Sequence, residues 1–153
     1  MKELNTPEFE HFQQFLKYFD ENSLGNLSPF FDAKLFTLES PATPSSIIRY
    51  AYPETEIEKA QISERSRDEV AAAIRGFFSH LEDVDKSASS GMGTEFLNGL
   101  QSCIADEYSN VWEYSPDRGG VDKLYDFIAF GFTYIVVTAD EKRCLVIHGG
   151  YMD

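Results

Sequence analysis

The stretch FIAFGFTYIVVTADEKRCLVIHGGYM, residues 127–152, decides the fold class of this chain of 153 residues. Residues 127–138 form a nearly all-apolar run rich in β-branched and aromatic side chains, a composition typical of a strand. Residues 140–143 are all charged and predict a turn, after which residues 144–147 are again apolar. The stretch therefore predicts a C-terminal β-hairpin. Its first strand is apolar on both faces, so we expect it to be central and covered by helices on at least one side.

The charged turn also predicts the register of this hairpin. The expected cross-strand pairs are Ala139–Cys144, Val137–Val146 and Ile135–His148. Cys144 and His148 would then share one face of a strand but stand about 13 Å apart, at about 3.3 Å per residue. A thiol–imidazole dyad is excluded at that distance, because a thiolate and its base must lie within hydrogen-bond reach. Gly149 and Gly150 predict the end of the strand, and His148, beside that end, is the residue that we would mutate to probe function.

Three helices are predicted before the hairpin, because apolar residues recur there at spacings of three and four. The first runs to about Glu21, with Thr6 as its cap and Pro7 at its first position. Residues 66–69, Ser-Arg-Asp-Glu, form a capping box that opens a second helix ending near residue 83. Thr94 is expected to cap the third helix, whose apolar face runs from Leu97 to Tyr108.

Short extended segments are predicted between and after these helices. Residues 28–53 hold four of the six prolines, and the apolar runs 35–38 and 47–52 between them favour strands. The apolar residues of 54–63 follow neither the helical spacing nor the alternation of a strand, so this segment stays unassigned. Residues 111–114 are typical of a further strand. The sequence thus predicts an α+β fold in a single globular domain spanning 1–153: about three helices packed on a mainly antiparallel sheet, with a C-terminal β-hairpin.

The net charge of −13, from 26 acidic and 13 basic residues, restricts the classes of partner. Direct nucleic-acid binding is disfavoured, because phosphate affinity comes chiefly from clustered Lys and Arg. No apolar run reaches the roughly 20 residues that span a bilayer, and the N-terminus is polar, so we expect a cytoplasmic protein without a membrane partner. In a reducing cytosol the two cysteines, Cys103 and Cys144, are expected as free thiols.

No motif in the sequence indicates a cofactor or metal, and we predict none. Residues 83–94 resemble the start of a calcium loop, but Ala88 and Thr94 occupy the positions that need Gly and Glu. The three histidines lack metal-ligand spacing, and the sequence contains no CxxC or GxSxG. Adjacent acidic pairs do not face one site on a helix, so they indicate solvated surface rather than an acid–base pair.

Our first functional hypothesis is a non-enzymatic acidic protein that binds a basic protein partner. Its most concrete version is an immunity or antitoxin-type inhibitor of a basic toxin such as a nuclease, because complementary charge speeds encounter and can occlude a cationic site. The acidic residues assigned to this interface are Glu82, Asp83, Asp85, Asp106, Glu107 and Glu113.

Two alternatives from other classes remain open. An enzyme or small-molecule-binding protein would use a site assembled from isolated residues, among them Cys144, His148 and carboxylates, and would show convergent polar groups with perturbed pKa values. A structural or oligomer-forming module would show a contiguous exposed apolar patch. The sequence leaves the oligomeric state open.

Overall fold

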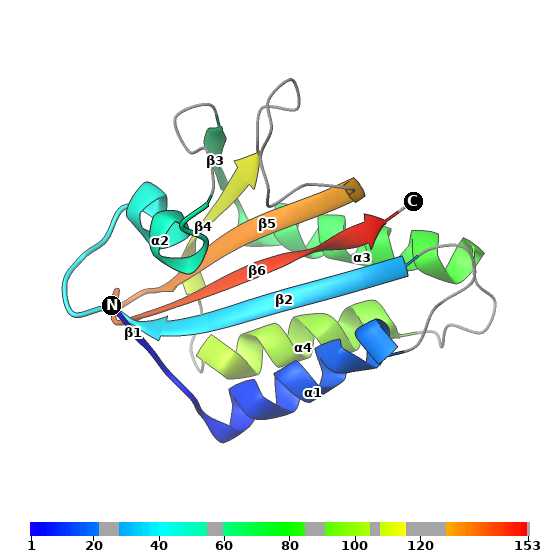
Figure 1. Ribbon diagram of the computed structural model, residues 1–153, viewed down its shortest axis with the longest axis horizontal. Coiled ribbons are helices and arrows are strands. Elements are labelled where there is room, and N and C mark those ends of the chain that lie inside the picture. Colours follow the sequence, from blue (N-terminus) through cyan, green and yellow to red (C-terminus); the bar gives the residue numbers. More distant parts are fainter. Residues whose placement is uncertain (22–27, 55–59, 85–90, 105–107, 116–127, 153) are drawn as a thin grey trace.

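An antiparallel sheet forms the centre of the protein in the computed structural model, which describes residues 1–21, 28–54, 60–84, 91–104, 108–115 and 128–152 (Figure 1). The strands in this part of the chain are β1 (Lys2–Glu3), β2 (Ser28–Thr37), β3 (Gln61–Arg65), β4 (Tyr108–Ser115), β5 (Ile128–Thr138) and β6 (Arg143–Met152). They are arranged in the order β1-β2-β6-β5-β4-β3, and each neighbouring pair is antiparallel. The long strand β5 lies in the interior of the sheet, as the sequence predicts, and its hairpin partner β6 lies there too.

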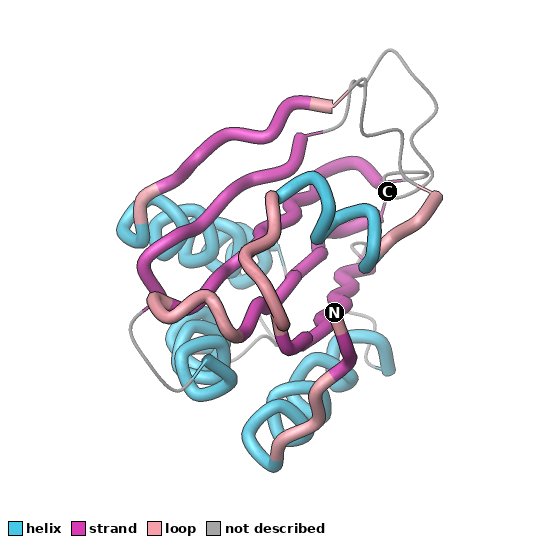
Figure 2. The backbone as a smooth tube through the Cα atoms, turned by 90° about the vertical axis from the view of Figure 1, so that its left-hand side faces the viewer, coloured by secondary structure: helices cyan, strands magenta, loops and turns pink. Residues whose placement is uncertain are grey.

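Helices cover both faces of this sheet. They are α1 (Pro7–Glu21), α2 (Pro44–Ala51), α3 (Arg67–Val84) and α4 (Met92–Ile104). Three of them, α1, α3 and α4, pack on one face, and α2 packs on the other, so that the sheet lies between two helical layers (Figures 1 and 2). The predicted α+β class with a C-terminal β-hairpin is confirmed, and the described residues contain one more helix than the sequence predicts.

Two of the three predicted helix starts are confirmed by their caps. The Phe9 backbone N–H donates to Thr6 Oγ1 at 3.1 Å. Ser66 and Glu69 form the reciprocal capping box, with distances of 3.0 and 3.1 Å. The third prediction, a cap at Thr94, is wrong: α4 begins at Met92, and the Gly91 carbonyl accepts its first bond, from Glu95 N–H at 3.0 Å. Gly91 has φ 93°, a conformation that suits glycine and starts the helix earlier.

The segment that contains the added helix α2 was expected to be extended. Its residues 47–52 are rich in apolar and β-branched side chains, but Thr43 caps a helix by accepting from Ser46 N–H at 3.2 Å. Pro44 fits the first helical position because that position needs no N–H donor. Ile47, Ile48 and Ala51 then share one buried face, so the capping signal prevails over the strand-like composition.

The hairpin forms with a register shifted by two residues from the predicted one. Observed pairs are Val137–Cys144, Ile135–Val146 and Thr133–His148. The predicted pairs are wrong because β5 ends at Thr138, whose hydroxyl donates to Asp140 Oδ1 at 2.6 Å and accepts from Arg143 N–H at 3.1 Å. Since the shift is even, each side chain still faces the predicted side.

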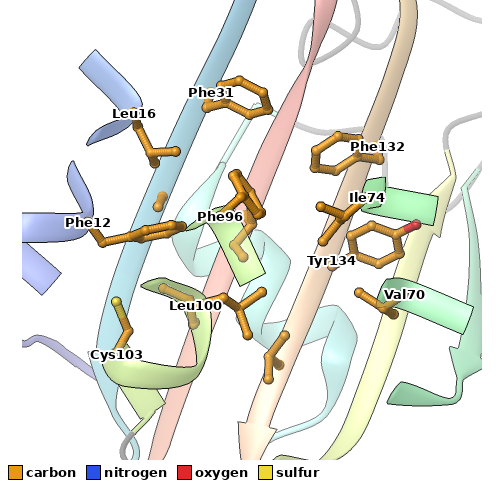
Figure 3. Packing of buried hydrophobic residues seen from close by; sticks show 14 of the residues in the cluster. Phe12, Leu16, Phe31, Val70, Ile74, Phe96, Leu100, Cys103, Phe132 and Tyr134 are labelled. Atoms are coloured by element: carbon orange, nitrogen blue, oxygen red, sulfur yellow. The ribbon is translucent and has the colours of Figure 1, made fainter. Parts of the chain in front are cut away.

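The two faces of the sheet carry separate apolar clusters. In the cluster under α1, α3 and α4, the Phe96 ring lies 5.4 Å from the Phe12 and Phe31 rings and 5.5 Å from the Phe78 ring (Figure 3). The cluster under α2 is mainly aliphatic and consists of Phe36, Leu38, Ile47, Ile48, Ala51, Tyr114, Ile135, Val137, Cys144 and Val146. Cys103 belongs to the first cluster and Cys144 to the second. Both are free, as expected, and both are buried.

Candidate functional site

One of the six acidic residues assigned to a partner interface is described with its side chain. Glu113 on β4 is half-buried and already paired, since its Oε2 lies 3.3 Å from Arg65 Nε and its Oε1 accepts from the Ser115 hydroxyl. Glu82 and Asp83 lie in the last turn of α3, but their side chains fall outside the described part of the structure. The remaining three, Asp85, Asp106 and Glu107, also lie outside the described residues.

A groove runs between α1 and α4 on the side away from the sheet. It has a volume of about 450 Å³, and we call it the α1–α4 groove. Phe12 and Phe15 supply its apolar side chains, whereas Glu8 and Glu95 come from the first turns of the two helices. The groove is lined by Pro7, Glu8, His11, Phe12, Phe15, Glu95, Asn98, Gly99 and Ser102.

Gly99 sets the close approach of the two helices beneath this groove. A Cβ atom added at Gly99 would lie 2.4 Å from Cδ1 of the Phe12 ring, closer than real Cβ atoms come. The Phe12 ring therefore rests directly on the α4 backbone, and any larger residue would push α1 away. The shape of the α1–α4 groove depends on this contact.

A second hollow lies on the opposite side of α1, beside the edge of the sheet. It has a volume of about 590 Å³, and we call it the β2–α1 trough. Three acidic residues, Glu3, Glu10 and Asp32, line it together with Lys34. The Asp32 carboxylate already accepts from the Tyr52 hydroxyl at the end of α2. Its other lining residues are Leu4, Asn5, Phe9, Gln13, Ala33 and Leu35.

Acidic residues line both hollows beside α1. Besides Asp32, their linings contain four acidic residues, which we call the acidic face: Glu3, Glu8, Glu10 and Glu95. Lys34 is the one Lys or Arg side chain that lines either hollow in the described residues, and it already contacts the fold. Its Nζ donates to the Ala51 carbonyl at 2.7 Å and lies 4.4 Å from the centre of the Tyr52 ring. Acidic residues therefore outnumber Lys and Arg in the described linings of the two hollows.

His148, the residue chosen from the sequence as a functional probe, lies on the α2 side of β6 and is 5% exposed. Its Nδ1 lies 2.9 Å from Thr133 Oγ1 and 3.2 Å from the Phe132 carbonyl oxygen. A carbonyl oxygen only accepts, so this contact favours the tautomer with its proton on Nδ1. The rings of Phe30 and Tyr52 flank the imidazole at 5.4 and 6.0 Å.

A polar row on this face joins His148 to the end of α2. Asp32, His148 and Thr133 are cross-strand neighbours on β2, β6 and β5. The Tyr52 hydroxyl, just after α2, donates to Asp32 Oδ2 at 2.6 Å. The Tyr52–Asp32 bond therefore fastens the end of α2 to the sheet, while His148 bonds to Thr133 and to the Phe132 backbone.

Cys144 lies on the same strand and face as His148, four residues away. Desolvation in the α2-side cluster raises the pKa of its thiol to about 12. A thiol with so high a pKa carries almost no thiolate at neutral pH and is a weak nucleophile. Elsewhere in the described residues, no group of three or more His, Cys, Asp or Glu side chains is placed to hold a metal ion.

The residues of the acidic face were missed by sequence reasoning. The acidic first turn of α1, with Glu8 and Glu10 beside an aromatic stripe, was a usable signal. The contribution of Glu95 could not be predicted, because nothing in the sequence shows that α4 lies beside α1. Within the described residues, no helix is both long and apolar enough to cross a membrane.

Comparisons with known proteins show a likeness of fold. No protein family matches the chain by sequence, and no curated protein does. Two crystal structures of citrus MAF1 resemble it, with TM-scores of 0.69 and 0.70 and sequence identities of 12% and 13%. The matches cover 92% and 95% of this chain and 98% of the MAF1 chain in each crystal form. The chain is therefore similar to citrus MAF1 in fold.

Proposed function

We propose that this protein is a non-enzymatic cytoplasmic binding protein that takes up a basic protein partner on its acidic face. The observation that carries the proposal is the set of acidic residues in the linings of the two hollows beside α1: Glu3, Glu8, Glu10 and Glu95 lie there, and the ammonium group of Lys34 is held by the Ala51 carbonyl. A surface of one sign draws an oppositely charged partner and raises the rate of encounter.

The α1–α4 groove adds a reason for a protein partner rather than a small cation. The half-buried ring of Phe15 offers a surface for an apolar side chain of the partner, while Glu8 and Glu95 meet flanking Lys or Arg. A partner with apolar and basic side chains on one surface fits this combination. The class that we put forward is a cationic toxin, such as a nuclease, whose active site an acidic inhibitor occludes.

The proposal is tested by titrating the protein against a panel of catalytically inactive basic nucleases over a salt series. We expect a partner whose association slows with added salt, because the attraction is screened over about 10 Å at 0.1 M salt. The double variant Glu8→Gln/Glu95→Gln should lower the association rate by about tenfold, since rim charges act mainly on that rate.

A matched variant separates the acidic face from net charge alone. Glu64→Gln/Glu141→Gln removes the same two charges from exposed positions on β3 and in the β5–β6 turn. This control should bind at nearly the original rate. Equal losses in both double variants, or association that is independent of salt, would contradict the proposal.

A further inference from the structure

The α1–α4 groove lies between two antiparallel helices (Figure 1). Cys103 Sγ lies 4.0 Å from the Glu8 carbonyl oxygen, and a Cβ atom at Gly99 would meet the Phe12 ring. A step of four residues back along α4 therefore corresponds to a step of four forward along α1. The next such step along α4 reaches Glu95, so Glu8 and Glu95 stand at opposite ends of the groove. They are about 12 Å apart along the helix axes, since each residue of a helix rises about 1.5 Å.

The direction of the side chains separates charge from apolar surface within the groove, because helical side chains lean toward the N-terminus of their helix. Glu8 and Glu95 each stand in the first turn of a helix, so both lean outward, one to each end of the groove. Phe15 leans toward the middle, and its half-buried ring lies between the two glutamates. Both glutamates are exposed, and within the described residues neither carboxylate forms an ion pair. The groove thus offers an apolar centre with a carboxylate at either end.

The form of partner segment that fits this groove is a helix. Lining residues recur at helical spacing on both sides, at positions 8, 11 and 15 of α1 and 95, 98 and 102 of α4. A third helix laid along the groove follows both rows for about two turns, which rise about 11 Å. An extended segment fits less well, because the backbone groups in the middle of α1 and α4 are bonded within each helix and cannot pair with it.

The charges at the two ends restrict the sequence of that helix. Two basic residues seven positions apart stand about 10.5 Å apart on one helix face, close to the axial spacing of Glu8 and Glu95. An apolar residue four positions after the first lies on the same face and meets Phe15. Among the described residues, no Lys or Arg lines the groove. A second copy of this chain is disfavoured as the occupant, because each copy has a net charge of −13.

We infer that the α1–α4 groove binds a helix of the basic partner, with an apolar residue on Phe15 and two Lys or Arg residues, about seven positions apart, on Glu8 and Glu95. The inference rests on the proposed function and names the form in which part of the partner binds. In such helix-in-groove recognition the apolar anchor supplies affinity, and the charges at the two ends fix the position of the helix along the groove.

Three peptides test the helical form and the charge spacing on the unaltered protein. The probe is acetyl-AQAAKAAALAAKAQAAY-amide, whose two lysines lie on the leucine face. Its control exchanges the second lysine with the glutamine two positions later, which turns that charge to the opposite face at constant composition. A third peptide has proline in place of the alanine before the leucine, which breaks the helix. We expect the probe to bind about two- to fivefold more tightly than its control, the effect of one surface ion pair, and the proline peptide to bind more weakly than the probe.

Protein variants and NMR shifts locate the bound helix. The backbone amide signals of Phe15 and Gly99 should shift when the probe is added. Glu8→Gln/Glu95→Gln should abolish the preference for the probe over its control. Glu64→Gln/Glu141→Gln, which removes two charges away from the groove, should keep that preference.

The outcomes separate this inference from the proposed function. Equal affinity for the probe and either of the other peptides, or no shift at Phe15 and Gly99 with millimolar probe, would overturn the inference. The proposed function would still stand if nuclease association slows with salt and in Glu8→Gln/Glu95→Gln, because the partner would then use the acidic face in another form. Shifts at these amides that grow with protein concentration alone would also overturn the inference, because a second copy would then occupy the groove.

Discussion

The two faces of the sheet are covered in different ways. On one face, α1, α3 and α4 enclose a cluster rich in aromatic rings, with Phe96 fully buried among them (Figure 3). On the other face, the eight-residue helix α2 covers a mainly aliphatic cluster and is fastened by polar contacts. Those contacts join Lys34 to the Ala51 carbonyl and Tyr52 to Asp32.

This difference follows from the lengths of the helices. An isolated helix shorter than about 12 residues is marginal in water, so α2 depends on its contacts with the sheet. Its buried face offers three residues, Ile47, Ile48 and Ala51, which is little area to hold a helix in one position. The longer helices bury whole aromatic stripes and need no comparable set of polar anchors. We therefore expect the three-helix face to lose more stability from a cavity, and the α2 face to lose more from a missing hydrogen bond.

The largest effect is expected from Phe96→Ala. Its ring contacts three others, from α1, β2 and α3, so the surroundings cannot close the space, and the free energy of unfolding should fall by about 3–5 kcal/mol. Ile48→Ala, equally buried under α2, should cost about 2 kcal/mol, because one short helix can settle toward the sheet. Urea denaturation followed by circular dichroism measures both. Equal losses would show that the two faces respond alike.

Much of the fold could be predicted from local signals. The Thr6 and Ser66–Glu69 caps and the charged turn of the C-terminal hairpin act within a few residues, and the structure confirms the elements they predict. The helix α2 was missed because residues 47–52 have strand-like composition, although Thr43 and Pro44 carried a local helix-start signal. The hairpin register was wrong by two residues because it depends on the bonds of Thr138, which composition does not show.

The candidate site could not be predicted, because it depends on contacts between distant segments. Glu8 and Glu95 line one groove, between α1 and α4, whose shape depends on the packing of Phe12 on Gly99. The role of Gly149 also depends on a distant segment. The glycine pair 149–150 predicts a strand end, but this prediction is wrong, because β6 continues to Met152. A Cβ at Gly149 would lie 2.4 Å from Cδ1 of Phe31, so this glycine serves ring packing within the strand.

A smaller effect is expected from Tyr52→Phe, which tests the polar anchors of α2. The change removes the hydroxyl that donates to Asp32 at 2.6 Å and keeps the ring beside His148 and Lys34. The free energy of unfolding should fall by about 1 kcal/mol, the typical net value of one hydrogen bond. Tyr50→Phe is the matched control, since Tyr50 lies in the last turn of α2, two residues before Tyr52, and is 45% exposed. A loss as large in Tyr50→Phe, or none in Tyr52→Phe, would contradict the role given to the polar anchors.

The last prediction concerns what the two faces share, which is a buried thiol in each. Burial raises the pKa of Cys103 and of Cys144 to about 12, from an ordinary value of 9.0. The unfolded chain therefore releases these thiol protons above pH 9 while the folded protein retains them, so the free energy of unfolding should fall as pH rises from about 9 toward 12. Urea denaturation at pH 8 and pH 10.5 should show a smaller fall in Cys103→Ala and in Cys144→Ala than in the original protein. Because the two pKa values are alike, the two variants should reduce the fall in the free energy of unfolding by similar amounts.

Thiol reactivity gives an independent check of this burial. Rapid reaction of either thiol with a disulfide reagent in the folded protein at pH 8 would show that water reaches that thiol. The two faces would then differ in hydration as well as in helix length.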